Sequence, residues 1–260
     1  MTPRRDAGIR SRSATATLSR VRVAVLSDIH SNSVALDAVL ATFDRVDAVW
    51  HLGDVVGYGP DPNGVIDRLR AIDASGVQGN HDAAAIGGKE IDWFNPVART
   101  AMIWTRDEID DASRAWLAEL PVRRETSDVT LVHGSPRDPT WEYVTSVEIA
   151  RDNFAIIETT HVLYGHTHRP MAYVERDGTV RPLTPDDGST VSLDTGRAML
   201  NPGSVGQPRD GSPDASYLVL DTDGRTCTWH RVQYDVERVQ AAMRTAGLPR
   251  SLVDRLTVGA

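Results

Sequence analysis

The sequence predicts an α/β protein with one mostly parallel sheet and a second, β-rich sheet. Over residues 22–164, short apolar runs alternate with amphipathic segments, which is the pattern of strand–helix–strand units with parallel strands. From residue 171 to residue 219 the chain changes to short strand-like runs separated by Gly, Pro and Asp turns. Its 260 residues are enough to bury a substantial core.

The first half of the chain supplies three strands and two helices. Residues 22–27 are almost continuously apolar and predict a buried strand. A helix follows over residues 33–43, capped by the serine at its start, with apolar residues at helical spacing. Residues 47–52 predict the second strand, a proline begins the helix of residues 62–69, and residues 75–78 predict a short third strand.

The rest of the chain continues the alternation and then ends in a helix. Residues 95–120 have helical periodicity, and residues 129–132 and 161–164 predict buried strands on either side of a helix over residues 147–157. After the β-rich region, residues 234–256 predict a closing helix. Beside the long helix, Trp93, Trp104 and Trp116 are interpreted as core anchors rather than ligand-binding residues.

Polar residues follow five of the predicted strands, at the points where the strands end. These segments are Asp28-Ile29-His30, Gly53-Asp54, Gly79-Asn80-His81-Asp82, His133-Gly134 and Gly165-His166-Thr167-His168, and they hold five of the eight histidines. His166 and His168 are two residues apart, so both point to one side of the backbone, and Gly165 gives the chain freedom to turn. Because ligands bind at the carboxyl edge of open α/β sheets, the segments are expected to form one site.

The side chains in these segments have the chemistry of a metal centre. The candidate ligands are Asp28, His30, Asp54, Asn80, His133, His166 and His168. This mixed nitrogen and oxygen set suits Mn, Fe, Zn or Ni rather than Ca, and manganese is favoured. Seven ligands exceed one tetrahedral site and predict two ions about 3.5–4 Å apart that share a carboxylate. Such a positive centre would attract an anion and would deprotonate a bridging water near neutral pH.

Composition excludes several other classes of protein. The net charge of −8 and the pI near 5.5 argue against sequence-independent binding to nucleic-acid phosphates. Cys227 is the only cysteine, so neither an intrachain disulfide nor thiolate metal ligation is expected. The longest apolar runs are far shorter than the ~20 residues that a membrane span needs. Neither a membrane nor a specific nucleic-acid sequence is expected as a partner.

Residues 1–20 differ in composition from the remainder. They carry five arginines but only one acidic residue, Asp6. Arg4-Arg5 is similar to a twin-arginine export signal, but no apolar stretch follows, so export is not expected. The segment is interpreted as a disordered tail or an over-long start assignment, and the protein is expected to be cytoplasmic.

In this order, the motifs strongly resemble those of the calcineurin-like metallophosphoesterase superfamily. The matching positions are Asp28-x-His30, Gly53-Asp54, Gly79-Asn80-His81-Asp82, His133 and Gly165-His166-x-His168, spanning residues 21–170. The resemblance implies one ion on Asp28, His30 and His168. It implies a second ion on Asn80, His133 and His166, with Asp54 bridging the two.

The same resemblance implies roles beyond the metal ligands. His81 would be the non-ligand histidine that protonates or stabilises the leaving oxygen, and the alternative is a residue that only orients a neighbouring ligand. Asp82 is a candidate catalytic residue that orients His81, or a helix cap. The implied fold is a two-sheet β-sandwich flanked by helices, forming a single domain over residues 21–260.

Three further segments narrow the resemblance to a small bacterial and archaeal phosphodiesterase-like branch. They are residues 53–60, 133–137 and 201–209. Some members of that branch cleave phosphodiesters and others hydrolyse diadenosine tetraphosphate. After Asp54 the chain lacks the Asp-Arg-Gly of protein serine/threonine phosphatases. Ser31 stands where the branch usually has glycine, and only a small local backbone effect is expected.

The resemblance implies a dinuclear metal-dependent phosphodiesterase in which a metal-bridging hydroxide attacks the phosphorus. It also implies a small phosphoester or nucleotide substrate. The alternatives are a diadenosine tetraphosphate hydrolase, a broad phosphomonoesterase, or a non-catalytic scaffold of the same fold. The retromer subunit is such a scaffold and lacks the histidine corresponding to His81. The presence here of His81 and of every ligand position favours an enzyme.

The substrate is expected to meet loops that flank the metal motifs. Residues 58–63, 135–143 and 204–210 are predicted rim loops because they are rich in Gly, Pro and Arg. Arg137 and Arg209 are candidate phosphate-binding residues, since a guanidinium matches phosphate bidentately, although solvated turn arginines would look the same. Tyr58 is interpreted as a packed loop aromatic, with stacking on a base as the alternative.

Overall fold

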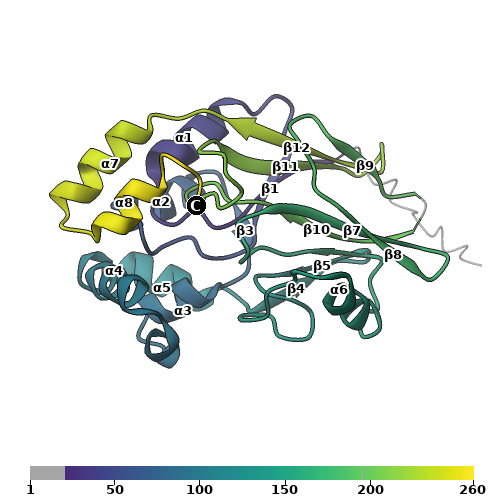
Figure 1. The fold of residues 1–260 in the computed structure, drawn as a ribbon, viewed down its shortest axis with the longest axis horizontal. Coiled ribbons are helices and arrows are strands. Elements are labelled where there is room, and N and C mark those ends of the chain that lie inside the picture. The colour runs from purple at the N-terminus through teal and green to yellow at the C-terminus, as the bar shows by residue number, and fades with distance from the viewer. Residues whose placement is uncertain (1–20, 195) are drawn as a thin grey trace, which may run out of the picture.

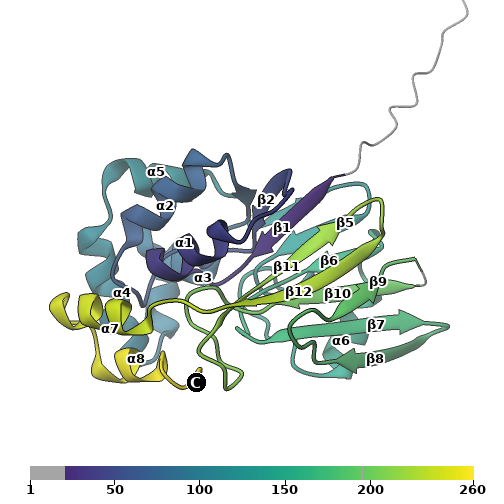
Figure 2. The same cartoon turned by 90° about the horizontal axis from the view of Figure 1, so that it is seen from above.

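The computed structural model describes residues 21–194 and 196–260. The predicted tail, residues 1–20, lies outside the described residues. Within them, two six-stranded sheets pack face to face, with helices outside each sheet and a group of helices at one end (Figures 1 and 2). The predicted two-sheet sandwich flanked by helices is confirmed, whereas the extent of a single domain stays a prediction.

The first sheet joins strands from both ends of the chain. Its order is β3 (Ser75–Gly76), β2 (Ala48–His51), β1 (Arg22–Leu26), β11 (Ala215–Asp221), β12 (Thr226–Val232) and β9 (Thr190–Ser192). Strands β1, β2 and β3 are parallel, and β11, β12 and β9 extend the sheet in antiparallel pairs. The sheet is therefore mixed, not mostly parallel as predicted.

The second sheet has the same mixed character. Its order is β4 (Arg123–Glu125), β5 (Val129–Val132), β6 (His161–Leu163), β10 (Arg197–Pro202), β7 (Pro170–Arg176) and β8 (Thr179–Leu183). Here β5, β6 and β10 are parallel, and the outer strands are antiparallel. The β-rich C-terminal region does not form a sheet of its own, because its strands complete both sheets.

Alternation along the strands separates the hydrophobic layers. Val23 and Val25 belong to a cluster that includes Leu163 of the second sheet, so they lie between the sheets. Their neighbours Ala24 and Leu26 belong to the cluster that packs against the helices outside the first sheet. Successive side chains of a strand point to opposite faces, so one nearly continuous apolar run serves both layers.

The helices follow the strands in chain order. They are α1 (Ser33–Ala41), α2 (Pro62–Ala71), α3 (Asn80–Ala85), a 3₁₀ helix (Lys89–Trp93), α4 (Pro96–Glu108), α5 (Asp111–Glu119), α6 (Val147–Phe154), α7 (Val236–Thr245) and α8 (Arg250–Arg255). Helices α1 and α6 cover opposite outer faces of the sandwich, and most of the others gather at one end (Figure 1). In the part of the chain that the structure describes, no helix is long and apolar enough to cross a membrane.

Capping side chains correct several predicted helix boundaries. Asn32, not Ser33, caps α1, because its side chain accepts the backbone N–H of Ala35 at 3.0 Å. The long helix predicted over residues 95–120 is two helices, α4 and α5. Asp110 lies between them and caps α5, because its side chain accepts the backbone N–H of Ser113. The closing helix is likewise divided between α7 and α8, at a glycine with φ +69° and a proline.

The predicted core tryptophans differ in their surroundings. Trp104 and Trp116 are partly buried and pack against hydrophobic clusters, as predicted. Trp93 is not a core residue, because 69% of it is exposed. Its apolar spacing relative to the helix did not indicate that it lies on a 3₁₀ turn at the surface.

Candidate metal centre

The carboxyl ends of five strands meet at one end of the sandwich. Asp28 follows β1, Asp54 follows β2, Asn80 follows β3, His133 follows β5 and His166 follows β6. All five side chains are buried in the interior despite being polar. The predicted convergence at the strand ends is therefore present in the structure.

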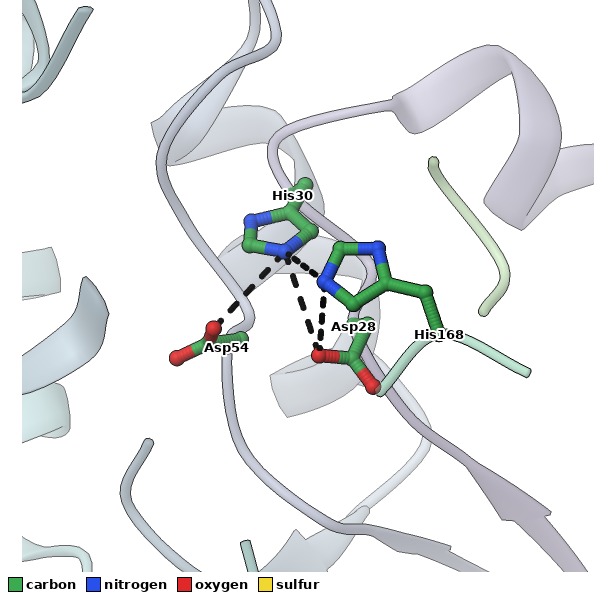
Figure 3. Close-up of side chains that lie close together, drawn as sticks. All are labelled: Asp28, His30, Asp54 and His168. Carbon is green, nitrogen blue, oxygen red and sulfur yellow. Dashed lines mark hydrogen bonds and ion pairs between the residues drawn. The ribbon is translucent and has the colours of Figure 1, made fainter. Parts of the chain in front are cut away.

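The first cluster consists of Asp28, His30, Asp54 and His168, whose facing ligand atoms all lie within 4.8 Å of one another (Figure 3). The Nε2 atom of His168 lies 3.2 Å from Oδ1 of Asp28. The Nε2 atom of His30 lies 3.7 Å from Oδ2 of Asp54 and 3.9 Å from Oδ1 of Asp28. These atoms face one another around a common point.

Hydrogen bonds outside the first cluster decide which ring nitrogens carry lone pairs. Nδ1 of His30 lies 3.1 Å from the carbonyl oxygen of Val56, and Nδ1 of His168 lies 2.6 Å from that of Gln207. A carbonyl oxygen only accepts, so the ring proton sits on Nδ1 and Nε2 keeps its lone pair. The two Nε2 atoms nevertheless face each other at 3.1 Å. Two facing lone pairs fit a cation between them.

The second cluster consists of Asp54, Asn80, His133 and His166 and shows the same pattern. Nδ1 of His133 donates to the carbonyl oxygen of Leu52 at 2.8 Å, which leaves Nε2 as an acceptor. That Nε2 lies 3.1 Å from Oδ1 of Asn80, 3.0 Å from Nδ1 of His166 and 3.3 Å from Oδ2 of Asp54. Asp54 belongs to both clusters.

The hydrogen bonding of Asp28 leaves one of its carboxylate oxygens free to bind a cation. Oδ1 of Asp28 is buried without a hydrogen-bond partner, while its Oδ2 accepts the hydroxyl of Ser27 at 2.7 Å and the backbone N–H of His166 at 3.1 Å. A buried polar atom normally has a partner, so the lone pairs of Oδ1 of Asp28 are available for a metal ion. His166 faces the second cluster through Nδ1, so its ring proton belongs on Nε2.

Burial also sets the protonation of the two clusters. It lowers the pKa of His30, His166 and His168 well below the ordinary value, which leaves these rings neutral, as metal ligation requires. Burial raises the pKa of Asp28 to about 7, so its charged form needs a compensating positive charge. His133 is also buried, but Asp54 raises its pKa to about 9, so this pair would release a proton on ligating a cation.

Two glycines allow the backbone to approach the carboxylates closely. A Cβ atom on Gly165 would lie 2.0 Å from Oγ of Ser27, and one on Gly79 would lie 2.1 Å from Oδ1 of Asp54. Gly165 was expected to supply an unusual turn conformation, but it has no positive φ. Its function is to leave space, and the turn is made by the residues that follow it.

Five of the seven predicted ligands have a left-handed backbone conformation. The φ angles are +52° for Asp28, +48° for His30, +50° for Asp54, +67° for His166 and +58° for His168. This conformation costs a non-glycine residue roughly 1–2 kcal/mol. Ser31, with φ +53°, takes it as well, and glycine would adopt it without strain. Strain of this kind concentrates at functional sites.

His81 faces the clusters without belonging to either. Its backbone N–H donates to Oδ1 of Asp54 at 2.8 Å, and its ring packs against Tyr58 and Phe94 with centroid distances of 4.3 Å and 4.5 Å. Nδ1 of His81 is buried without a partner. Burial lowers the pKa of His81 to about 4.

Asp82 is placed as a helix cap. Its two carboxylate oxygens accept the backbone N–H groups of Gly79 at 3.0 Å and Val56 at 3.1 Å. These bonds fix the start of α3 against the loop that follows β2. Asp82 does not line the cavity beside the clusters, so the geometry favours the cap over the catalytic alternative.

A cavity of about 120 Å³ opens over the two clusters. Its lining includes residues of both clusters, His81 and the five aromatic side chains Tyr58, Trp93, Phe94, Trp141 and Tyr143. All three predicted rim loops contribute to it, through Tyr58, through Trp141 and Tyr143, and through Arg209. Tyr58 is only 8% exposed, in agreement with its interpretation as a packed aromatic. Phe94, Trp141 and Tyr143 were not singled out in the sequence, because the local sequence does not distinguish a loop aromatic that lines a cavity from one that packs in the core.

The structure brings one of the two predicted arginines to this cavity. Arg209 lines it, lies over the ring of Tyr58 at 5.7 Å and donates to Gln207 at 2.9 Å. No carboxylate among the described residues forms an ion pair with Arg209. The guanidinium of Arg137 instead pairs with Glu142 and with Asp152, outside the cavity lining.

Comparison with known proteins agrees with this geometry. Residues 21–225 match the profile of the calcineurin-like phosphoesterase superfamily domain. An uncharacterized protein of Methanocaldococcus jannaschii is 34% identical over 244 residues, covering 91% of this chain and 98% of that protein. A crystal structure of a metallophosphoesterase from Sphaerobacter thermophilus has a TM-score of 0.85 and 45% identity, covering 93% of this chain and 100% of that one.

A third similarity covers only part of the chain. The symmetrical bis(5′-nucleosyl)-tetraphosphatase of Chromohalobacter salexigens is 31% identical over 168 residues. That alignment spans 58% of this chain and 58% of the relative.

Proposed function

Because this chain belongs to the calcineurin-like phosphoesterase superfamily, we propose that it is a dinuclear metal-dependent phosphodiesterase. The observation that carries the proposal is the pair of buried clusters joined by Asp54, in which acceptor atoms face one another at about the spacing of metal ligands. When bound, two divalent cations would supply a positive centre and Lewis acidity for a phosphate group.

The chain's own residues divide the work of holding the ions. In this proposal Asp28, His30 and His168 hold one ion. Asn80, His133 and His166 hold the other, and Asp54 contacts both. Manganese stays the favoured metal. The Nδ1–carbonyl hydrogen bonds fix the orientation of three of these rings, as outer partners of metal-ligating histidines commonly do.

His81 is proposed to act on the leaving group. Its ring lines the cavity next to Asp54, and its Nδ1 is buried beside Gly57, so Nε2 is the ring nitrogen that can reach a substrate. Packing between Tyr58 and Phe94 fixes the plane of the ring. A ring held in this way can donate a hydrogen bond or a proton to the oxygen that leaves phosphorus.

A second candidate function is hydrolysis of a dinucleoside polyphosphate. The partial similarity to symmetrical bis(5′-nucleosyl)-tetraphosphatases favours it, since that alignment includes more than half of this chain. The substrates of both candidate functions have a phosphate with an organic group on each side. A broad phosphomonoesterase would need no contacts beyond the metals and the phosphate.

Substrate profiling tests the proposed function. The manganese-loaded protein should have a higher kcat/KM for bis-p-nitrophenyl phosphate or diadenosine tetraphosphate than for p-nitrophenyl phosphate. Activity should vanish with a chelator and return with Mn²⁺, because no side chain of the two clusters can replace the Lewis acidity of the ions. A preference for p-nitrophenyl phosphate, with both other substrates untouched, would establish the monoesterase instead. Full activity in rigorously metal-free protein would exclude the metal-dependent mechanism.

Replacing Arg209 by alanine should weaken substrate binding, whereas replacing Arg137 should not. Arg209 lines the cavity with no carboxylate partner, so it is available to bind a phosphate oxygen. A hydrogen bond to a charged group contributes about 1.5–3 kcal/mol, so KM should rise by one to two orders of magnitude. Steady-state kinetics on the preferred substrate measure this. Equal KM values for the two variants would remove Arg209 from the binding site.

A further inference from the structure

A connected row of aromatic rings leads outward from the second cluster. Tyr143 stacks on the ring of His166 with centroids 3.9 Å apart and planes at 23°. Trp141 presents an edge to His166 at 6.3 Å, and Trp93 packs edge-on against Trp141 at 5.1 Å. We call Trp93, Trp141 and Tyr143 the aromatic wall.

The exposure of the aromatic wall is unusual within this protein. Trp93 is 69% exposed and Tyr143 is 47% exposed. Among the described aromatic side chains, these are the two that are exposed, and both line the cavity over the clusters. They come from separate segments, the 3₁₀ helix before α4 and the loop after β5. Exposed rings that gather at one cavity indicate a surface that binds an apolar, flat group.

Another part of the cavity lining has a different character. Arg209 lies there over Tyr58, beside His168 of the first cluster. The cavity thus offers cationic and metal-binding groups for a phosphate, and flat uncovered rings next to them. A nucleotide has the matching pair of features, because its phosphate is anionic and its base is planar and weakly polar.

We propose that the aromatic wall stacks on a nucleobase of the substrate, so that the phosphoesters cleaved at this site are nucleotide esters. This inference rests on the proposed function, because it assigns the substrate class of the same site. Base–aromatic stacking tolerates any base, since every base has a π face. The wall therefore selects nucleotides over alkyl phosphates without selecting one base.

The test compares two ligands that differ only in the base. Adenosine 5′-monophosphate and ribose 5-phosphate are titrated into the manganese-loaded full chain by isothermal calorimetry. Stacking of one base contributes about 1–3 kcal/mol, which corresponds to a 5- to 140-fold tighter binding of the nucleotide. In Trp93→Ala this advantage should fall toward parity, and Trp93→Phe should retain part of it.

Control variants separate stacking from a change in fold. Trp93 is mostly exposed, so Trp93→Ala should keep the melting temperature of the parent. Ile103→Ala removes another exposed apolar side chain, on α4 and outside the cavity lining, and should leave both affinities unchanged. Hexyl phosphate, which has an apolar tail but no ring, should bind no tighter than ribose 5-phosphate.

Several results would overturn the assignment of the aromatic wall. Equal affinity of the parent protein for the nucleotide and for ribose 5-phosphate is one. An unchanged advantage in both Trp93→Ala and Trp141→Ala is another, and an equal gain for hexyl phosphate is a third. If the protein hydrolyses bis-p-nitrophenyl phosphate but gives any of these results, the proposed function stands and the assignment of the aromatic wall is wrong. If the nucleotide binds more tightly than ribose 5-phosphate but no phosphoester is hydrolysed, the aromatic wall is supported and the proposed function is contradicted.

Discussion

The Asp54→Asn variant is expected to lose bound metal together with activity. Asp54 is the one residue shared by both clusters, and its Oδ2 faces His133 at 3.3 Å and His30 at 3.7 Å. Asparagine has nearly the same shape and tolerates the left-handed backbone of this position, but it removes one of two negative charges. Losing an outer-shell partner typically costs 10- to 100-fold in metal affinity, and we expect a shared inner ligand to cost more than about 100-fold.

Metal content and stability measure this result directly. Elemental analysis after gel filtration should find about two ions per chain in the parent, as in two-metal sites, and fewer than one in Asp54→Asn. Asp82→Asn is the matched control, because Asp82 is an equally buried carboxylate outside both clusters. It should keep its metal and lose about 1 kcal/mol of stability as a weakened helix cap. Two ions retained by Asp54→Asn would show that Asp54 does not bridge them.

The His81→Ala variant is expected to show the opposite pattern. His81 lies outside both clusters, so metal content should equal that of the parent. The rate should fall on the order of 10²- to 10⁴-fold, the usual contribution of a general acid or of a hydrogen bond to the leaving oxygen. The loss should appear mainly in kcat, because the contact forms as the leaving oxygen develops charge.

A second substitution distinguishes a structural role from a chemical one. His81→Asn keeps a donor of similar reach and should recover part of the rate if His81 acts by hydrogen bonding. Melting temperatures of both variants in excess Mn²⁺ control for damage to α3. A fall in metal content in His81→Ala would make His81 a ligand and contradict its assignment to the leaving group.

The elements that hold the candidate site were predictable because each has a local cause. Continuous apolar runs predicted β1, β2 and β5, and the polar residues directly after them predicted the convergence of Asp28, Asp54 and His133. Pro62 correctly marked the start of α2, because proline fits the first turn of a helix.

The remaining features depend on contacts that the local sequence does not contain. Alternation indicates which face of a strand is buried, but not which strand lies beside it, so the entry of β11 and β12 into the first sheet was missed. Arg137 and Arg209 looked equivalent in sequence, and only the positions of Glu142 and Asp152 separate them. Trp93 resembled a core residue in sequence, because the local pattern did not show that it lies on an exposed 3₁₀ helix.

The left-handed backbone conformations of the site lower the stability of the fold while they position side chains that the proposed function needs. A variant with glycine at position 30 or 168 would relieve strain and, under the proposed function, lose a metal ligand in the same step. Selection for heat resistance in metal-free conditions would therefore favour inactive proteins, a trade-off found where a site is strained. Thermostabilising substitutions in this chain are better sought at the surface of α2 or α7, and screens should be run with Mn²⁺ present so that the clusters contribute to the stability being measured.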